Sequence, residues 1–278
     1  TGKISFKNGH PVIQFLIGAS DYLLLGSSIR LCGDFKCWLD STAGPSSLGA
    51  AADQLNMDCR TGVFGAIEQL VVKNVGQFST IEHIKSYNRF MASYMPVTSA
   101  DTDVSGHFSE TALTTANPYE QKSSVVNGTN NVNDQNSFSV HLPCGLFLGQ
   151  QPIFIGEQGI NGIVIELHLT PDSQFFHAMN GLPQGGTATT KTLANAYYEF
   201  SNLKLTAELI QPDPKTLQSL TSKSGSTYQY NSISSYYTSI NSANAIVNFN
   251  LGLRNVLGCW CNFIEANRIN NFQFNGLS

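Results

Sequence analysis

Short runs in which apolar and polar residues alternate recur along the chain and predict β-strands. The clearest run lies in residues 162–170, where every second position is aliphatic (Ile163, Ile165, Leu167 and Leu169). A period of two residues indicates a strand with one buried face and one partly hydrated face. Weaker runs of the same kind predict strands in residues 11–17, 21–31, 137–141 and 198–210. Glycine, proline and asparagine separate the runs, as is typical of turns between strands.

Residues 61–95 combine the period of a strand with the period of a helix. The first half, residues 64–73, is a mostly apolar run and predicts a packed strand. From Ser79 onward, apolar residues recur every three or four positions, which predicts one amphipathic helix with the stripe Ile81, Ile84, Tyr87, Met91, Tyr94 and Met95. Ser79 and Glu82 have the spacing of a capping box at the start of this helix. Pro96 is expected to lie just past its end.

Two polar stretches interrupt the pattern. Residues 97–136 are rich in Ser, Thr, Asp and Asn and have no hydrophobic period, so we expect an exposed loop insertion of variable conformation. Residues 221–244 are biased toward Ser, Thr, Tyr and Asn. Around this second stretch, residues 215–220 predict one helical turn, and residues 247–253 and 258–263 predict two further strands.

Many short strands and a single helix predict an all-β fold. The expected architecture is an antiparallel β-sandwich, of which the jelly roll is one form, with one packed amphipathic helix. The chain has 15 basic and 19 acidic residues, a net charge of -4 and only 12% charged residues. Because such a surface creates little long-range field, attraction to nucleic acid is not expected. No run approaches the roughly 20 apolar residues of a membrane span, so we expect no transmembrane segment.

No arrangement of residues predicts a catalytic or metal-binding site. Glu166 and His168 share one face of a predicted strand and can begin a metal site, but without a third ligand a hydrated sheet face is the simpler interpretation. His83 and Tyr87 lie one turn apart on the predicted helix, without a carboxylate partner in local spacing. The acidic residues of the long polar stretch lack the spacing of a calcium-binding loop (Asp101, Asp103, Glu110 and Asp134). We therefore expect no catalytic residue, no cofactor and no bound metal.

The six cysteines are sparse for a disulfide-stabilised fold (Cys32, Cys37, Cys59, Cys144, Cys259 and Cys261). The spacing from Cys32 to Cys37 and that from Cys259 to Cys261 are not those of zinc ligands. We expect free thiols that pack as small apolar side chains, and no disulfide. Asn127 begins a match to a glycosylation sequon, which we interpret as part of a polar loop.

Three regions, in this order, carry a family resemblance. The first is the predicted strand and helix of residues 61–95. The second is HLPCGLFLG at residues 141–149, followed at a short interval by GIVIELHL at residues 162–169. The third is YYEFSNLKLTAELI at residues 197–210. Their order and spacing resemble the first jelly roll of double jelly-roll major capsid proteins, in the branch of virophages and polinton-like viruses and the lineage that includes adenovirus.

This resemblance implies a jelly roll over residues 1–210, followed in residues 211–278 by a linker and the incomplete beginning of a second jelly roll. We expect the sequence to be a piece of a longer two-domain protein. Like the family it resembles, the protein would be a structural major capsid protein of a dsDNA virus, without enzymatic activity. Homotrimers would form pseudo-hexagonal capsomers of an icosahedral shell, in contact with neighbouring capsomers and with minor capsid or penton proteins. It would be located in the virion after assembly inside the infected host cell, with no sequence-specific contact to nucleic acid.

Two other functions remain open at this point. One is a carbohydrate-binding β-sandwich module that stacks sugars on tyrosines (Tyr197, Tyr198, Tyr228, Tyr230, Tyr236 and Tyr237). Sugars fit these rings better than nucleic-acid bases do, because a basic lining is missing. The other is an enzyme on a cupin-like roll, which would require a cluster of histidine and glutamate ligands that the sequence does not bring together.

Overall fold

The computed structural model describes residues 4–5, 11–41, 44–46, 55–56, 62–77, 79–98, 124–126, 136–149, 151–157, 159–171, 196–222, 228–240, 244, 246–248, 255–259 and 261. Within this part of the chain, the helical elements are η1 (a 3-10 helix, Gly62–Ala66), α1 (Tyr87–Thr98) and α4 (Pro214–Ser222). The strands are β1 (Ile4–Ser5), β2 (Val12–Ile17), β3 (Leu23–Ser41), β4 (Gly44–Ser46), β5 (Leu55–Asn56), β6 (Ile67–Asn74), β7 (Thr80–Lys85), β8 (Ser124–Val126), β9 (Asn136–His141), β10 (Ile153–Phe154), β11 (Ile163–Leu169) and β12 (Ala196–Ile210).

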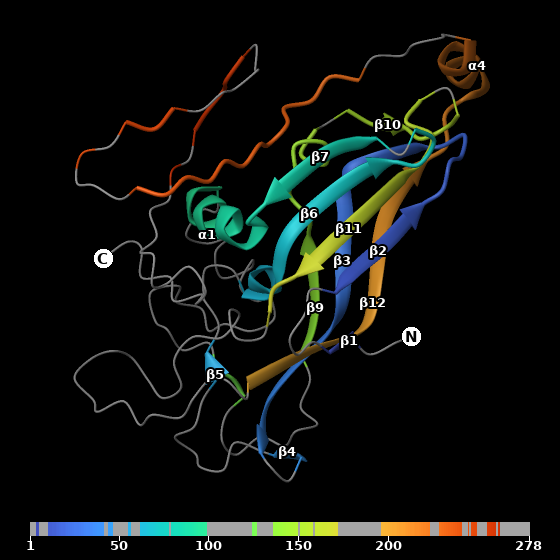
Figure 1. Cartoon of the computed structure of the whole chain (residues 1–278). Helices are drawn as coiled ribbons and strands as arrows, with labels where there is room; N and C mark the ends of the chain where they lie inside the picture. The colour runs from blue at the N-terminus through green and yellow to red at the C-terminus, as the bar shows by residue number, and fades with distance from the viewer. Residues whose placement is uncertain are drawn as a thin grey trace.

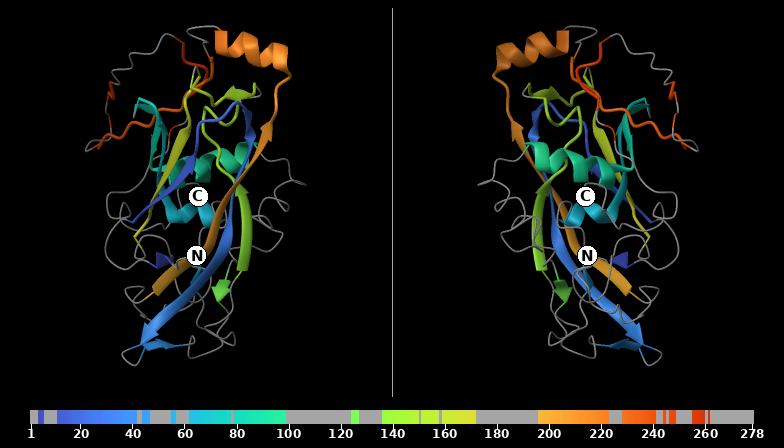
Figure 2. Two further views of the ribbon diagram at one scale, coloured as in Figure 1. Left: turned by 90° about the vertical axis from the view of Figure 1, so that its right-hand side faces the viewer. Right: turned by 90° about the vertical axis from the view of Figure 1, so that its left-hand side faces the viewer.

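Two antiparallel sheets face each other and form the body of the molecule (Figures 1 and 2). One sheet has the order β2-β11-β6-β7. The other has the order β1-β12-β3, with β9 and β10 pairing in succession with β3 and β4 pairing near its end. A separate small ladder joins β5 to β8. The two large sheets are therefore the layers of a β-sandwich.

The order of the strands identifies the sandwich as a jelly roll. Eight strands build it in chain order: β1, β2, β3, β6, β7, β9, β11 and β12, with β10 continuing the β3 edge beyond β9. One sheet holds the first, eighth, third and sixth of these strands, which are β1, β12, β3 and β9. The other holds the second, seventh, fourth and fifth, which are β2, β11, β6 and β7. Strands that are distant in sequence are thus neighbours in each sheet, which is the arrangement of a jelly roll. The predicted fold class is confirmed.

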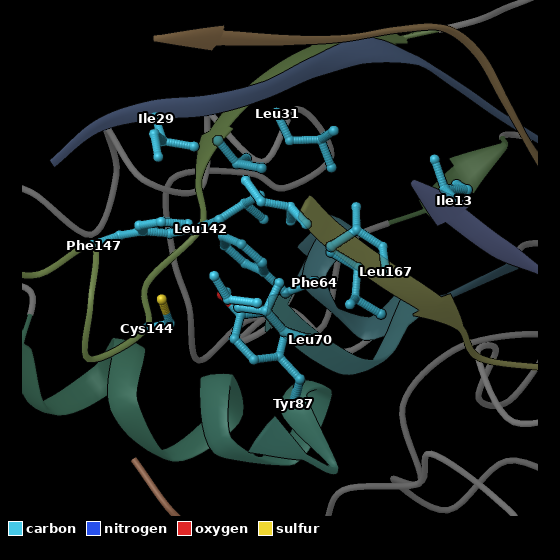
Figure 3. Packing of buried hydrophobic residues seen from close by; sticks show 14 of the residues in the cluster. Ile13, Ile29, Leu31, Phe64, Leu70, Tyr87, Leu142, Cys144, Phe147 and Leu167 are labelled. Atoms are coloured by element: carbon cyan, nitrogen blue, oxygen red, sulfur yellow. The ribbon is translucent and has the colours of Figure 1, made fainter. Parts of the chain in front are cut away.

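The core lies between the two sheets and follows the predicted alternation. Ile163, Ile165 and Leu167 of β11 are at most 1% exposed, whereas His168 on the other face is partly exposed. On the opposite sheet, the rings of Phe35 and Phe200 meet edge to face, with their centroids 5.2 Å apart. Burial of each such side chain stabilises the fold by roughly 1.5–3 kcal/mol. Figure 3 shows core side chains of β3, β6 and β11, such as Leu31, Leu70 and Leu167, between the two sheets.

The beginning of the predicted helix is in fact a strand. β7 pairs with β6 in a hairpin, and its inward positions, Glu82 and Ile84, lie opposite the core residues Val72 and Leu70. The capping box of Ser79 and Glu82 therefore does not form. Instead, the Ser79 carbonyl oxygen accepts a 2.9 Å hydrogen bond from the N–H of Asn74 and closes the turn. The β-branched residues of this stretch favour a strand, and the free edge of β6 supplies its partner.

Helix α1 begins at Tyr87, directly after Ser86, whose φ of 53° turns the chain out of β7. The Ser86 carbonyl oxygen accepts hydrogen bonds from the N–H groups of Arg89 and Phe90, at 3.0 Å each. Within α1 the predicted apolar stripe faces the core, since its residues Tyr87 and Met91 are fully buried. Tyr87 points from α1 toward Leu70 and Phe64 (Figure 3). The expected end before Pro96 is wrong, since the helix runs through Pro96 to Thr98.

Beyond the roll, the chain continues into α4 and then into extended segments. The predicted helical turn of residues 215–220 is confirmed as part of α4. Asp213 caps this helix by accepting hydrogen bonds from the N–H groups of Lys215 and Thr216, at 3.0 and 3.1 Å. The strands predicted in residues 247–253 and 258–263 are not seen in their described residues, which form no ladder. The rest of both stretches lies outside the described residues.

The expected loop insertion of residues 97–136 is described only in part. Residues 97–98 end α1, residues 124–126 form β8, and residue 136 begins β9. The remainder of the stretch lies outside the described residues.

Candidate functional site

Glu82 is the most constrained carboxylate among the described residues. It is only 4% exposed and faces the interior from the middle of β7. Its Oε1 atom accepts hydrogen bonds from the N–H groups of Gly145 at 3.0 Å and Ile233 at 2.6 Å. Its Oε2 atom accepts a third from the N–H of Leu146 at 3.0 Å. Three backbone donors compensate for the loss of water around this buried group.

Two of the three donors to Glu82, the N–H groups of Gly145 and Leu146, belong to the turn that follows β9. Pro143 and the end of β9 direct the chain into this turn, which the Leu148 N–H closes by donating to the Cys144 carbonyl oxygen at 2.9 Å. A Cβ atom on Gly145 would lie 2.0 Å from the Asn231 carbonyl oxygen and 2.8 Å from Glu82 Oε1. A Cβ atom on Gly149 would lie 2.6 Å from the Tyr228 hydroxyl oxygen. Gly145 therefore needs to be glycine for the close approach of a second backbone segment, whereas at Gly149 the neighbouring atom is the tip of a side chain.

That second segment is residues 228–233, which we call the strap. The Tyr228 hydroxyl donates to the Gln151 carbonyl oxygen at 2.9 Å, and the Tyr230 hydroxyl donates to the Ile81 carbonyl oxygen at 3.0 Å. The two rings are stacked, with centroids 6.1 Å apart. Together with Ile233, both tyrosines pack against the edge of the core. The strap is thus held at both ends and in the middle by the jelly roll.

We call the surface under the strap the Glu82 groove, defined by Ile81, Glu82, Gly145, Gly149 and Gln151. In Figure 1 the chain beyond α4 runs back along the molecule past β7 and α1, as expected for a strap across this side. Every polar contact between groove and strap that is described above involves at least one backbone atom. The arrangement can therefore bind an extended peptide segment, with two tyrosine side chains adding specificity.

The surroundings of Glu82 disfavour additional negative charge. Burial, followed by the charge of Glu82, raises the pKa of the Cys144 thiol well above its usual value. Burial also raises the pKa of Tyr87, with Cys144 and Glu82 adding to it. The pKa of Tyr230 is raised by burial and then by Glu82. All three groups are consequently neutral near pH 7, and Cys144 is not a reactive thiolate.

A second polar cluster lies on the outer face of the β2-β11-β6-β7 sheet. Lys73 Nζ lies 2.7 Å from both carboxylate oxygens of Glu166, and Gln14 Nε2 donates to Oε1 at 2.9 Å. Burial alone would raise the pKa of Glu166. The hydrogen bond and charge of Lys73, with the Gln14 hydrogen bond, more than offset this effect and leave the pKa below its usual value.

The structure shows where the predicted site residues lie. His168 Nε2 is 3.9 Å from Glu166 Oε2, so the predicted pair does share a face, but Lys73 occupies the carboxylate. His83 lies on β7 rather than on the helix, and its Nε2 bonds Gln69 Oε1 at 2.8 Å. Burial, then the nearby cations, lowers the pKa of His83. Tyr87 instead points into the core and donates to the Pro143 carbonyl oxygen.

Several other predicted features fall outside this geometry. The described residues contain no group of three or more histidine, cysteine, aspartate or glutamate side chains that could hold a metal ion. Within the same part of the chain, the cysteines whose side chains are described are free thiols (Cys32, Cys144, Cys259 and Cys261). No helix of the described part is long and apolar enough to cross a membrane. The acidic residues and the sequon of the long polar stretch lie outside the described residues.

Sequence reasoning missed the Glu82 groove because the spacing of Ser79 and Glu82 also fits a helix start. A signal was nevertheless present. In a strand TIEHIK, Glu82 and Ile84 fall on the same face, so a glutamate is placed among core residues and must find donors. The glycines at positions 145 and 149 indicate the close approach of another segment, but not which one.

The geometry defines the protein as a jelly-roll β-sandwich with a docked C-terminal segment. No family model matches the sequence, and no curated protein matches it at a significant level. Among solved structures, the chain is similar to a chain described as "PBCV-1 virus capsid, quasi-atomic model", with a TM-score of 0.39 and 12% sequence identity. The alignment covers 79% of this chain and 44% of that chain, so the present chain spans less than half of the solved chain. A likeness at this level is too low to define a family.

Proposed function

We propose that this chain is a structural subunit of a viral capsid shell. In full, it is a major capsid protein of the double jelly-roll type, and its homotrimers form pseudo-hexagonal capsomers of an icosahedral virion. These capsomers contact one another and minor capsid or penton proteins. The observation that carries the proposal is the jelly-roll strand order of the two facing sheets. This architecture is used by viral capsid proteins, lectins and cupins, so it includes the proposed class without selecting it alone.

The sequence resemblance supports the capsid class among these. Its three regions all fall within the one sandwich. Residues 61–95 supply η1, β6, β7 and most of α1, residues 141–149 supply the turn under the strap, and residues 162–169 and 197–210 coincide with β11 and β12. Stretches that are separate in sequence thus meet around a common core, as a shared fold would require.

The same proposal includes a boundary near Ile210, with the jelly roll over residues 1–210 and the start of a second unit over residues 211–278. In support, β12 pairs with β3 up to its last residue, Ile210 opposite Leu23, and the chain leaves the sheet there. Helix α4, which follows, has no buried residue. Few contacts therefore tie this connection to the roll, as is typical of a link between domains.

Three of the six tyrosines named for the carbohydrate-binding alternative are engaged in the fold. Tyr198 is fully buried in the core, and its hydroxyl donates to the Thr170 carbonyl oxygen. Tyr228 and Tyr230 are held in the Glu82 groove. Tyr236 and Tyr237, at 52% and 71% exposed, remain open to solvent. Among the tyrosines whose side chains the structure describes, Tyr236 and Tyr237 are therefore the candidates for stacking on a sugar.

Light scattering of the purified protein after size exclusion tests the proposal. We expect a particle of three times the 30.2 kDa chain mass, or a larger shell. A monomer that persists at high protein concentration would count against a capsid role. In parallel, a glycan array with the wild-type chain and a Tyr236→Ala/Tyr237→Ala variant tests the alternative. Glycan retention by a monomer, lost in the variant, would favour the carbohydrate-binding function.

A further inference from the structure

We propose that the Glu82 groove is a peptide-docking site for an extended Tyr-x-Tyr-x-x-Ile segment, and that a second copy of the chain can supply this segment in place of its own strap. The structure shows the site filled by residues 228–233 of the same chain. The inference concerns the groove itself. It goes beyond the proposed capsid function and does not rest on it.

The groove binds one backbone N–H and two tyrosine hydroxyls, which any extended segment with the sequence of the strap would present. The Ile233 N–H donates to Glu82, and the hydroxyls of Tyr228 and Tyr230 donate to carbonyl oxygens of the roll. One main-chain N–H and two tyrosine hydroxyls of the segment thus bind the roll, and the tyrosine side chains supply the specificity. Tyr228, Tyr230 and Ile233 are the strap residues that are packed against the core, whereas Gln229 and Asn231 between them are exposed.

The shape of the groove is selective as well. Gly145 and Gly149 leave room for the strap at two separate points, one beside the Asn231 carbonyl and one beside the Tyr228 hydroxyl. A methyl group at either glycine would collide with the strap at less than 3.0 Å. The roll thus leaves room for a segment here, and a single carbon added at Gly145 would collide with the backbone of that segment.

The groove can exist without the strap because its charged group keeps other partners. The Glu82 carboxylate retains the N–H groups of Gly145 and Leu146, both of which belong to the turn of the roll itself. Ile233 adds a third donor to a carboxylate that is already hydrogen-bonded. Loss of the strap therefore does not leave an uncompensated buried charge, which would be far more costly.

The connection between the roll and the strap does not fix which copy fills the groove. The structure describes residues 211–222 of this connection, and their helix α4 has no buried residue. The position of the strap is then set by its contacts in the groove rather than by the packing of the connection. An identical segment from another copy can make the same contacts, and exchange of an identical element is a low-cost route to association.

The first test uses a full-length chain whose own strap is disabled by Tyr228→Ala/Tyr230→Ala/Ile233→Ala. A fluorescein-labelled peptide with the sequence of residues 226–235 is titrated into it and followed by anisotropy. We expect saturable binding with one peptide per chain. Binding to the wild type should be much weaker, because its tethered strap competes at an effective concentration on the order of mM. A scrambled peptide is the control for non-specific binding.

Adding Gly145→Ala to the strap-disabled chain supplies the matched control. We expect the peptide to bind at least about tenfold more weakly, the factor that corresponds to about 1.4 kcal/mol. Gly149→Ala should weaken binding less, because its added carbon meets only the tip of the Tyr228 side chain. Circular dichroism verifies that each variant is folded. No binding to the folded strap-disabled chain, or equal binding with and without Gly145→Ala, would overturn the docking site.

The second test asks whether a second copy can supply the segment. The Gly145→Ala chain keeps a normal strap that its own groove cannot hold, and the strap-disabled chain keeps an open groove. Hydrogen exchange with mass spectrometry distinguishes the two straps by their sequence masses, whatever the oligomeric state. We expect the strap of the Gly145→Ala chain to exchange fast alone and to become protected when the strap-disabled chain is added. Unchanged exchange overturns docking between copies, and trimers that still form in that case would leave the capsid proposal standing.

Discussion

Tyr87 connects helix α1 to the turn after β9 through one buried hydrogen bond. Its side chain is fully buried, and its hydroxyl donates a 3.0 Å hydrogen bond to the Pro143 carbonyl oxygen. Tyr87→Phe keeps the ring but leaves this carbonyl without its donor, so we expect a loss of about 1–3 kcal/mol in the free energy of unfolding. Urea denaturation measures it. Tyr237→Phe, at a side chain 71% exposed, should leave the midpoint unchanged. Equal midpoints for all three proteins would contradict the assigned contact.

The Glu166 cluster predicts a pH dependence of stability. The pKa of Glu166 is lower in the folded chain than its ordinary value of 4.5. The ionised form is therefore favoured by folding, and its stabilisation is fully present above pH 4.5 and is lost as the pH falls through the lower folded pKa. We expect wild-type thermal stability to fall more steeply below pH 4.5 than that of Glu166→Gln. Parallel melting curves from pH 7 to pH 3 would contradict the Lys73 pairing.

Local spacing alone could not predict the partners of these single residues. Glu166 and His168 were correctly expected on one sheet face, because alternation fixes the face of each strand residue. Lys73 as the partner of Glu166 depends on the pairing of β11 with β6, which brings together residues 93 positions apart. For Glu82, the donor on Ile233 is 151 positions away. Such partners follow from the register of strands, not from neighbouring letters.

At the scale of elements, mutations in β7 can distinguish the observed strand from the helix predicted for the same residues. In the predicted helix, Ile81 and Ile84 belong to one buried stripe and should matter equally. In the observed strand, Ile84 is fully buried opposite Leu70, whereas Ile81 is only partly buried. We expect Ile84→Ala to lower the free energy of unfolding by about 2–5 kcal/mol, and Ile81→Ala by clearly less. Equal losses of the free energy of unfolding, measured by urea denaturation, would contradict the strand and favour the helix.

Elements with a long, regular alternation were predictable and those with a mixed pattern were not. β11 and β9 were found with nearly correct ends, because both have one apolar face over several residues. In residues 79–85 the apolar residues fit both the alternation of a strand and the three-to-four spacing of a helix. The strand forms because it pairs with the open edge of β6. In β12, the register shifts between Ser201 and Lys204 next to Asn202, whose φ is 53°, so one alternation cannot describe the whole strand.

At the scale of the whole molecule, the sandwich was predictable from the number of strands and turns, and the Glu82 groove was not. A β-sandwich follows from many half-buried strands that need a second sheet to cover them. The groove instead depends on three segments that meet only after the roll has folded: β7, the turn after β9 and the strap. The strap lies in a polar stretch whose composition by itself indicates no partner.

The central claim is that identical copies of this jelly roll assemble into a shell. Negative-stain electron microscopy of the purified chain at rising protein concentration tests this claim most directly. We predict particles with threefold symmetry, or curved sheets and closed shells built from them, because identical subunits with a self-complementary surface form closed symmetric assemblies. Single particles of one chain at every concentration, folded by circular dichroism, would contradict the account.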